Sequence, residues 1–238
     1  MTLFGQCSRL RLKLRDSKKN RKLIGMLFAG PAILTVLVLI AYPVGFTIYF
    51  SFHEWFVSSL TPPRFIGLQN YISMLSDQRL WNSIIHSVYF VVLAVSLQLA
   101  LGMIIALLLN RDFKGRGLLR TFFLLPMMAT PSAIALIMMM MFDPSMGIIN
   151  YLLNLIGIPS QLWLANPYLV IPTLALMDTW QWTPFMVLML LAGLSTLPMD
   201  SYEASTIDGA SKLQTFRYIT LPLLRPTILV ALMFRIIA

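Results

Sequence analysis

Three long stretches of this chain carry no Lys, Arg, Asp or Glu, and they limit its possible folds more than any other feature. They are Leu23–Phe52, Leu80–Asn110 and Thr121–Phe142. A helix of about 20 apolar residues, rising about 1.5 Å per residue, crosses a hydrocarbon core of about 30 Å. Only 11% of all residues are charged, whereas soluble domains carry about a quarter. The sequence therefore predicts an all-α, polytopic helical membrane protein.

The positive charge of the chain is concentrated in a few short segments. The formal net charge is +9, and eight of the 18 Lys and Arg residues lie in residues 1–22. Aromatic residues are not interleaved with them, which argues against a nucleic-acid partner. The pattern indicates a topology signal and contact with membrane lipid. The positive-inside rule makes the N-terminus and loops 111–120 and 198–225 cytoplasmic, and segments 53–79 and 143–170 external.

This alternation divides the chain into a basic tail, residues 1–22, and a transmembrane domain, residues 23–238. Segment 144–166 is apolar but is interrupted by Pro, Gly and Asn, so we expect a short external helix, Ile148–Ile156, and no span there. The expected spans are residues 24–51, 82–109, 119–142 and 171–196, with a fifth that begins near Leu223.

The last apolar stretch, Pro226–Ala238, has only 13 residues. A helix of that length reaches about 20 Å and does not cross the hydrocarbon core. We therefore expect the sequence to be truncated within its fifth helix, with roughly 50 further residues needed to complete a fifth and a sixth span.

A polar segment, residues 198–222, lies between the last two apolar stretches. Pro198 ends a span, and Asp200 is expected to cap a new helix with Glu203 three residues later. Gly209 suits the left-handed residue that follows a helix. A second short helix is expected from Ser211, with Leu213, Phe216 and Thr220 on one face. The segment is thus a helical hairpin, which we call the 198–222 hairpin.

The hairpin contains Glu203-Ala-Ser-Thr-Ile-Asp-Gly209, then nine residues, then Ile219-Thr-Leu-Pro222. This spacing resembles the coupling loop of binding-protein-dependent ABC importer permeases, whose pattern is Glu-Ala-Ala, three residues, Gly, nine residues, Ile-x-Leu-Pro. Only Ser205, which is also small, departs from it. The resemblance implies that the hairpin fits a cleft on an ATPase subunit; the alternative is a helix pair that only rests on the membrane. The expected coupling residues are Glu203, Ala204, Ser205, Asp208, Gly209, Ile219, Leu221 and Pro222.

Further segments are similar to the carbohydrate-uptake branch of that family, the sugar permeases related to the maltose and glycerol-3-phosphate systems. This resemblance implies a type I permease of six helices in the cytoplasmic membrane of a prokaryote. The implied partners are a second permease subunit, two ATPase subunits that bind ATP and Mg²⁺, and an extracytoplasmic sugar-binding protein. The segments are Phe65–Tyr71, Asn110–Gly117 with Arg120 and Pro126, Gly147–Asn150, Trp182–Phe185 and Ala192–Leu194.

Signatures of catalysis are absent from the sequence. It has no phosphate-binding Gly-x-x-x-x-Gly-Lys-Ser/Thr loop, no Gly-x-Ser-x-Gly and no Cys-x-x-Cys. His53 and His86, the two histidines, cannot form a metal site without remote carboxylates. We therefore expect no enzyme activity, no metal and no cofactor in this chain.

Two ionisable residues lie inside expected spans, Asp178 and Arg235, and such residues are functional candidates. Helical rise places their depths about 10 Å apart, which disfavours direct contact unless Pro184 kinks its helix. Trp180, Gln181 and Trp182 form a polar-aromatic cluster beside Asp178. Because sugars stack on aromatic rings and bond to amides and carboxylates, these four residues of 178–182 are a possible substrate path; the alternative for the tryptophans is an interfacial aromatic belt.

The sequence thus predicts the permease subunit of an ATP-driven ABC importer for a sugar or sugar derivative. Two alternatives stay open. One is a permease for an amino acid, phosphate or another anion, since those carry related loops. The other is a membrane enzyme that acts on lipid-linked sugars through Asp178 and Arg235.

Overall fold

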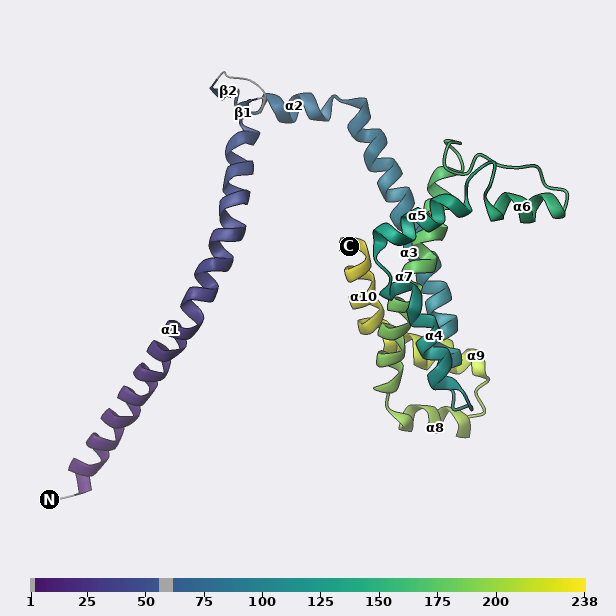
Figure 1. Ribbon diagram of the computed structural model, residues 1–238. Coiled ribbons are helices and arrows are strands. Elements are labelled where there is room, and N and C mark those ends of the chain that lie inside the picture. Colours follow the sequence, from purple (N-terminus) through teal and green to yellow (C-terminus); the bar gives the residue numbers. More distant parts are fainter. Residues whose placement is uncertain (1–2, 56–61) are drawn as a thin grey trace. The chain divides into compact units, whose positions relative to one another are not determined.

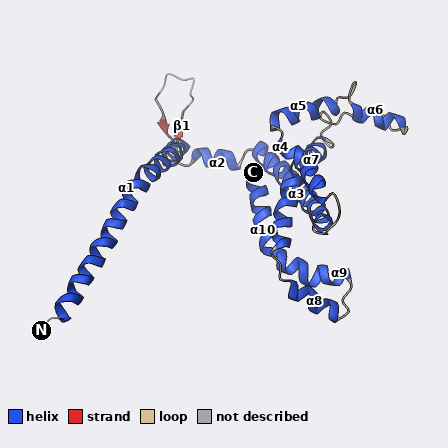
Figure 2. Cartoon of the chain, turned by 60° about the horizontal axis from the view of Figure 1, so that its bottom comes forward, coloured by secondary structure: helices blue, strands red, loops and turns tan. Residues whose placement is uncertain are grey.

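The computed structural model describes residues 3–55 and 62–238, with side chains from residue 26 onward. The chain divides into two compact units, Met1–Leu80 and Trp81–Ala238, and each is described separately. Helices make up most of the described chain (Figure 1, Figure 2), which confirms the all-α prediction.

The first unit consists of α1 (Leu3–Ser51), a two-residue antiparallel ladder and α2 (Gln69–Leu75). The helix α1 begins at Leu3 rather than near residue 24, because the Arg, Lys and Leu residues of the basic tail favour helix. From Met26 to Ser51 it is apolar, and no residue there is buried. A helix that is apolar all round suits a lipid environment.

A short ladder follows α1, in which β1 (His53–Glu54) pairs with β2 (Arg64–Phe65). Asn70 holds this turn against the end of α1: its Nδ2 donates to the carbonyls of Ser51 and His53. The Tyr71 hydroxyl donates to Ser51 Oγ at 2.8 Å. The segment Phe65–Tyr71, which carried part of the sequence resemblance, therefore ties together the chain on both sides of the ladder.

The second unit is built around three long helices. They are α3 (Gln78–Leu109), which starts at the unit boundary, α7 (Val170–Ser195) and α10 (Leu221–Ile237). These bounds confirm the spans predicted at 82–109 and 171–196 and the fifth span near Leu223. The described residues contain four helices long and apolar enough to cross a membrane, or five if a bent pair counts as one span.

The bent pair corrects one prediction. Instead of a single helix over residues 119–142, the chain forms α4 (Arg116–Met128) and α5 (Pro131–Met141), which meet at 91°. Pro131 is the first residue of α5, and Thr130 before it is extended, at φ −64° and ψ 137°. A proline disfavours helical geometry in the residue that precedes it, so the apolar stretch is continuous while the helix is not.

The core of this unit lies along α7, which packs against α4 and α10. Met186 and Leu190 have no exposed surface. Two glycines bring the neighbouring helices close: a Cβ on Gly102 would lie 2.7 Å from Met186 Cγ, and one on Gly193 would lie 2.7 Å from Thr227 Cγ2. Small residues at helix crossings are typical of membrane bundles. Tight packing thus fixes α3 and α10 on α7.

The segment between α5 and α7 contains α6 (Ile148–Leu155), which confirms the predicted short helix at 148–156 to within one residue. Asn150 organises it: Nδ2 donates to the carbonyls of Pro144 and Gln161, and Oδ1 accepts from Gln161 N and Trp163 Nε1. Asp143 accepts from the backbone N–H groups of Met146 and Ser145, and these hold the pKa of its carboxyl below the usual value. The two hydrogen bonds stabilise the fold fully at pH values above the ordinary pKa of an aspartate. This stabilisation is lost as the pH falls through the lowered pKa of Asp143.

Candidate functional site

Three polar side chains from three different helices meet within the apolar core of the second unit. Arg235 of α10 forms an ion pair with Asp178 of α7, with Nη2 2.6 Å from Oδ2. Gln98 of α3 joins both: its Nε2 donates to Asp178 Oδ2 at 2.7 Å, and its Oε1 accepts from Arg235 Nε at 2.8 Å. We call Gln98, Asp178 and Arg235 the polar triad.

The ion pair of the triad corrects the expectation that Asp178 and Arg235 are too far apart for contact. That estimate counted the rise to Arg235 from Pro226, the first residue of the last apolar stretch, whereas α10 begins at Leu221. The five additional residues add about 7.5 Å of rise, which closes most of the expected gap, and the long arginine side chain spans the rest. No kink at Pro184 is required.

The triad is largely buried, and Asp178 is its most exposed member. The exposed fraction of the side chain is 8% for Arg235 and 21% for Asp178, and Gln98 has no exposed surface. The guanidinium carbon of Arg235 lies 5.1 Å from the ring centroid of Trp182, a cation–π contact. Opposite charges thus cancel inside the span, as buried ionisable groups in a membrane require.

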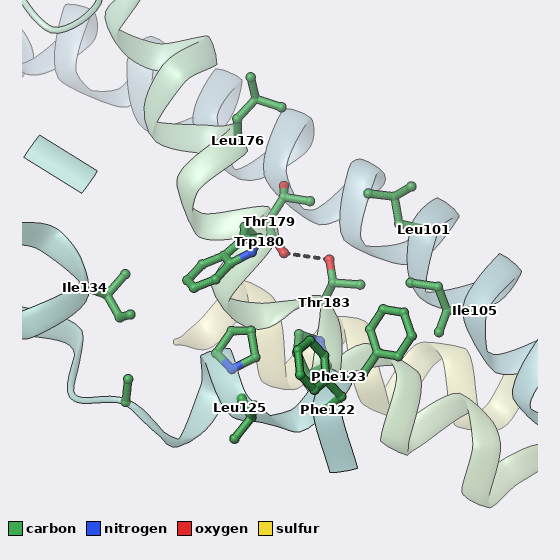
Figure 3. Close-up of a pocket in the computed structure, with 13 residues that line it drawn as sticks. Leu101, Ile105, Phe122, Phe123, Leu125, Ile134, Leu176, Thr179, Trp180 and Thr183 are labelled. Carbon is green, nitrogen blue, oxygen red and sulfur yellow. Dashed lines mark hydrogen bonds between the residues drawn. The ribbon is translucent and has the colours of Figure 1, made fainter. Parts of the chain in front are cut away.

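Trp180 lies on a different surface of α7 from the triad. It lines an apolar cavity of about 720 Å³ formed by α3, α4, α5 and α7 (Figure 3). Thr183 Oγ1 donates to the Thr179 carbonyl, and Thr179 Oγ1 is the only fully buried side-chain oxygen or nitrogen without a partner among the described residues. A hydroxylated solute would find few hydrogen-bond partners there. The four predicted substrate-path residues are therefore separated: Asp178 and Trp182 contact Arg235, Trp180 faces this cavity, and Gln181 is nine-tenths buried.

The first half of the 198–222 hairpin is α8 (Met199–Ile207). The predicted Asp200 cap is wrong, because the extended residue before the helix is Pro198, and Asp200 lies in the first turn without a side-chain capping bond. Gly209 has φ 71°, which confirms the predicted left-handed residue. Ser205 is buried and donates to the Tyr202 carbonyl. Glu203, Ala204 and Asp208 are exposed, so α8 presents an acidic outer surface.

The second half begins with a complete capping box: Ser211 Oγ accepts from Gln214 N, and Gln214 Oε1 accepts from Ser211 N. Helix α9 (Lys212–Thr215) continues into a π-helix, η1 (Phe216–Thr220), and then into α10. Of the three residues expected on one face, Phe216 and Thr220 turn inward and Leu213 is 74% exposed, so that prediction holds in part.

The two halves of the hairpin are joined by the Tyr202 hydroxyl, which donates to Thr220 Oγ1 at 3.0 Å. A hollow of about 220 Å³ separates them, and its walls include Ala204, Ser205, Asp208 and Ile219. Ile219 and Leu221 are half-buried and Pro222 is exposed. The expected coupling residues therefore gather in one compact element between α7 and α10.

Sequence reasoning missed one member of the triad, Gln98. The only available signal was a glutamine in the middle of an uncharged span, where an amide needs a partner. Its partners are 80 and 137 residues away along the chain, so no local pattern could identify them.

Helices of membrane-spanning length, a polar triad between them and a folded polar hairpin are typical of a multi-pass helical membrane protein. Residues 98–238 match the family described as "Binding-protein-dependent transport system inner membrane component". The chain belongs to this family and is an inner-membrane permease subunit of an ABC importer. Members of the family are transporters, so the alternative of a membrane enzyme loses its support.

Individual proteins agree with this assignment. The trehalose/maltose transport system permease protein MalF of Thermococcus litoralis is 41% identical over 95% of this chain and 75% of that protein. The sulfoquinovosyl glycerol transport system permease protein SmoG of Agrobacterium fabrum is 36% identical over 91% of this chain and 70% of its own length. A solved bacterial ABC transporter for the acidic polysaccharide alginate superposes with a TM-score of 0.76 at 24% identity, over 94% of this chain and 75% of that one, and shows the same fold.

Proposed function

We propose that this permease imports a sugar or sugar derivative across the cytoplasmic membrane at the expense of ATP hydrolysed by partner subunits. The observation that carries the proposal is that the polar triad and the hairpin share α7 and α10. The hairpin connects the C-terminal end of α7 to the N-terminal end of α10, and two residues of the triad lie farther along the same helices. Movement of the hairpin therefore reaches the membrane-embedded polar groups through two continuous helices.

The choice of a sugar rests on two supports. Curated relatives are named for trehalose and maltose and for sulfoquinovosyl glycerol. Within the span, Asp178 and Gln181 supply a carboxylate and an amide, which bond to hydroxyl groups, and Trp182 lies beside them. We keep Asp178, Gln181 and Trp182 as the substrate path and assign Trp180 to its edge, because its surroundings are apolar.

The proposed assembly contains a second permease subunit, two ATPase subunits and an external binding protein. The exposed Glu203 and Ala204 of α8, with Asp208 directly after it, are the proposed contact with the ATPase, which holds ATP and Mg²⁺. The family description names a binding protein, and the alginate transporter was solved with a periplasmic protein bound to alginate pentasaccharide. The N-terminus is proposed to be cytoplasmic because of the basic residues in 1–22.

The test is sugar uptake by the purified complex in liposomes, with the ATPase inside and the binding protein outside. Radiolabelled trehalose, maltose and sulfoquinovosyl glycerol serve as probes, with glutamate and phosphate as comparison solutes. We expect uptake of at least one sugar that requires ATP and stops in Asp178→Ala. Uptake of glutamate or phosphate in place of every sugar would refute the proposal.

A further inference from the structure

We propose that Gln98 is a positioning residue that keeps the Arg235–Asp178 ion pair closed, and that the closed pair makes the site prefer uncharged over anionic sugars. This inference rests on the proposed function and concerns the charge of the substrate. It concerns Gln98, the member of the triad that lies on α3. The predicted substrate path does not include this residue.

Gln98 is placed to hold both charges at once. Its amide nitrogen donates to Asp178 Oδ2, and its amide oxygen accepts from Arg235 Nε. A glutamine offers both kinds of group, whereas a carboxylate offers only acceptors and an ammonium only donors. Because the side chain has no exposed surface, its amide bonds to these two side chains and not to bulk solvent.

The closed pair presents its negative member. The guanidinium of Arg235 is occupied at Nε by Gln98 and at Nη2 by Asp178, and Trp182 lies against its face. Only 8% of the Arg235 side chain is exposed, against 21% of Asp178. A solute that reaches the triad therefore meets the carboxylate side of a neutral pair, which accepts hydrogen bonds from sugar hydroxyls and offers no free cation to a carboxylate or sulfonate.

The similar proteins leave the charge of the substrate open. One solved structure belongs to an importer of an acidic polysaccharide, while a curated relative is named for trehalose and maltose. Family membership cannot distinguish these two cases. The arrangement of the triad does distinguish them, because an anionic solute would need the guanidinium that Gln98 and Asp178 occupy.

Replacing Gln98 by methionine keeps the volume of the side chain and both charges but removes the two hydrogen bonds. Arg235 then loses its Nε acceptor and is free to turn toward an anionic solute. We expect the preference for the neutral sugar to fall about tenfold, the effect of one hydrogen bond to a charged group.

The experiment measures equilibrium binding to the purified permease–ATPase complex in lipid nanodiscs, without the binding protein, so that only the membrane site selects. The probes are trehalose and maltose, each paired with its 6-carboxylate form, and intrinsic tryptophan fluorescence reports binding. Wild type is expected to bind the neutral form at least tenfold more tightly. Gln98→Met should reduce that ratio about tenfold, and Asp178→Asn should reverse it.

Gln69→Met is the matched control, since Gln69 is exposed and lies in α2; its ratio should equal that of wild type. The inference is overturned if wild type binds the acidic forms equally well or binds neither form, or if Gln98→Met keeps the wild-type ratio. ATP-driven sugar uptake would still stand in those cases. Loss of all sugar uptake in wild type would instead refute the proposed function.

Discussion

At the scale of single residues, the ion pair between Arg235 and Asp178 is the most consequential contact in the described chain. Two opposite charges buried together offset part of each other's desolvation cost, but either one alone leaves an uncompensated charge in an apolar core. We therefore expect variants that lose one charge to differ, in stability and in transport, from variants that lose both charges.

Arg235→Met alone is expected to destabilise the permease by about 3–5 kcal/mol, since it leaves Asp178 unpaired. Asp178→Leu combined with Arg235→Met removes both charges and should recover most of that loss. Unfolding of each variant in detergent, titrated with denaturant, measures the difference. A double variant as unstable as the single one would show that the pair is not a closed unit.

Gly209→Val is expected to abolish sugar uptake while membrane insertion and basal ATPase activity persist. The backbone of Gly209 is left-handed, at φ 71°, and a β-branched residue is strained there. Gly117→Val is the matched control, because Gly117 has open space around its Cβ position and no positive φ. Normal uptake and normal substrate-stimulated ATPase activity in Gly209→Val would mean that the hairpin does not transmit movement.

At the scale of elements, the hairpin owes its shape to local hydrogen bonds. The capping box of Ser211 and Gln214 starts α9, and the bond from Tyr202 to Thr220 joins the two halves. These hydrogen bonds lie within the hairpin and hold its two halves together. They therefore keep the exposed surface of α8 in place for another subunit.

Ser211→Ala should lower the stability of the hairpin by about 1 kcal/mol, because the amide of Gln214 loses its capping acceptor. Hydrogen–deuterium exchange of residues 212–215 should accelerate in this variant. Ser201→Ala, in the first turn of α8, removes the same hydroxyl without a capping bond and should leave exchange unchanged. Equal exchange rates in Ser211→Ala and Ser201→Ala would show that the capping box does not stabilise the hairpin.

The sequence predicted most of the elements but few of the contacts between them. Uncharged stretches located α3 and α7, and Gly209 identified the turn of the hairpin, because these signals are local. The break before Pro131 was hidden by an apolar stretch that continues through it. The Asp200 cap failed because Pro198, two residues earlier, takes the extended conformation that a cap needs. The Arg235–Asp178 contact was missed because the depth of Arg235 was counted from Pro226, five residues after the start of α10.

At the scale of the whole molecule, orientation in the membrane decides whether the proposed roles are possible. The hairpin can meet an ATPase only if residues 198–222 are cytoplasmic, and α6 must then be external. The charges of the intervening segments support this orientation: the segment 143–170 has no Lys or Arg, whereas 111–120 has four.

Single cysteines at Lys114, Leu155 and Lys212, introduced in a Cys7→Ser background, test the orientation. All three native side chains are exposed in the structure, so access depends on the side of the membrane. An impermeant maleimide should label only position 155 in intact cells and all three positions after permeabilisation. Labelling of position 212 in intact cells would rule out the proposed orientation.

The π-helix η1 has a consequence for α10. A π-turn acts as one extra residue inserted in an α-helix, and each residue of an α-helix rotates the chain by about 100°. The five residues Phe216–Thr220 thus set the rotation of α10 about its own axis, and with it the side chains that α10 turns toward α7. Deleting one of them would turn the whole helix about its own axis, and Leu224, Ala231 and Arg235 would all swing away from α7 together.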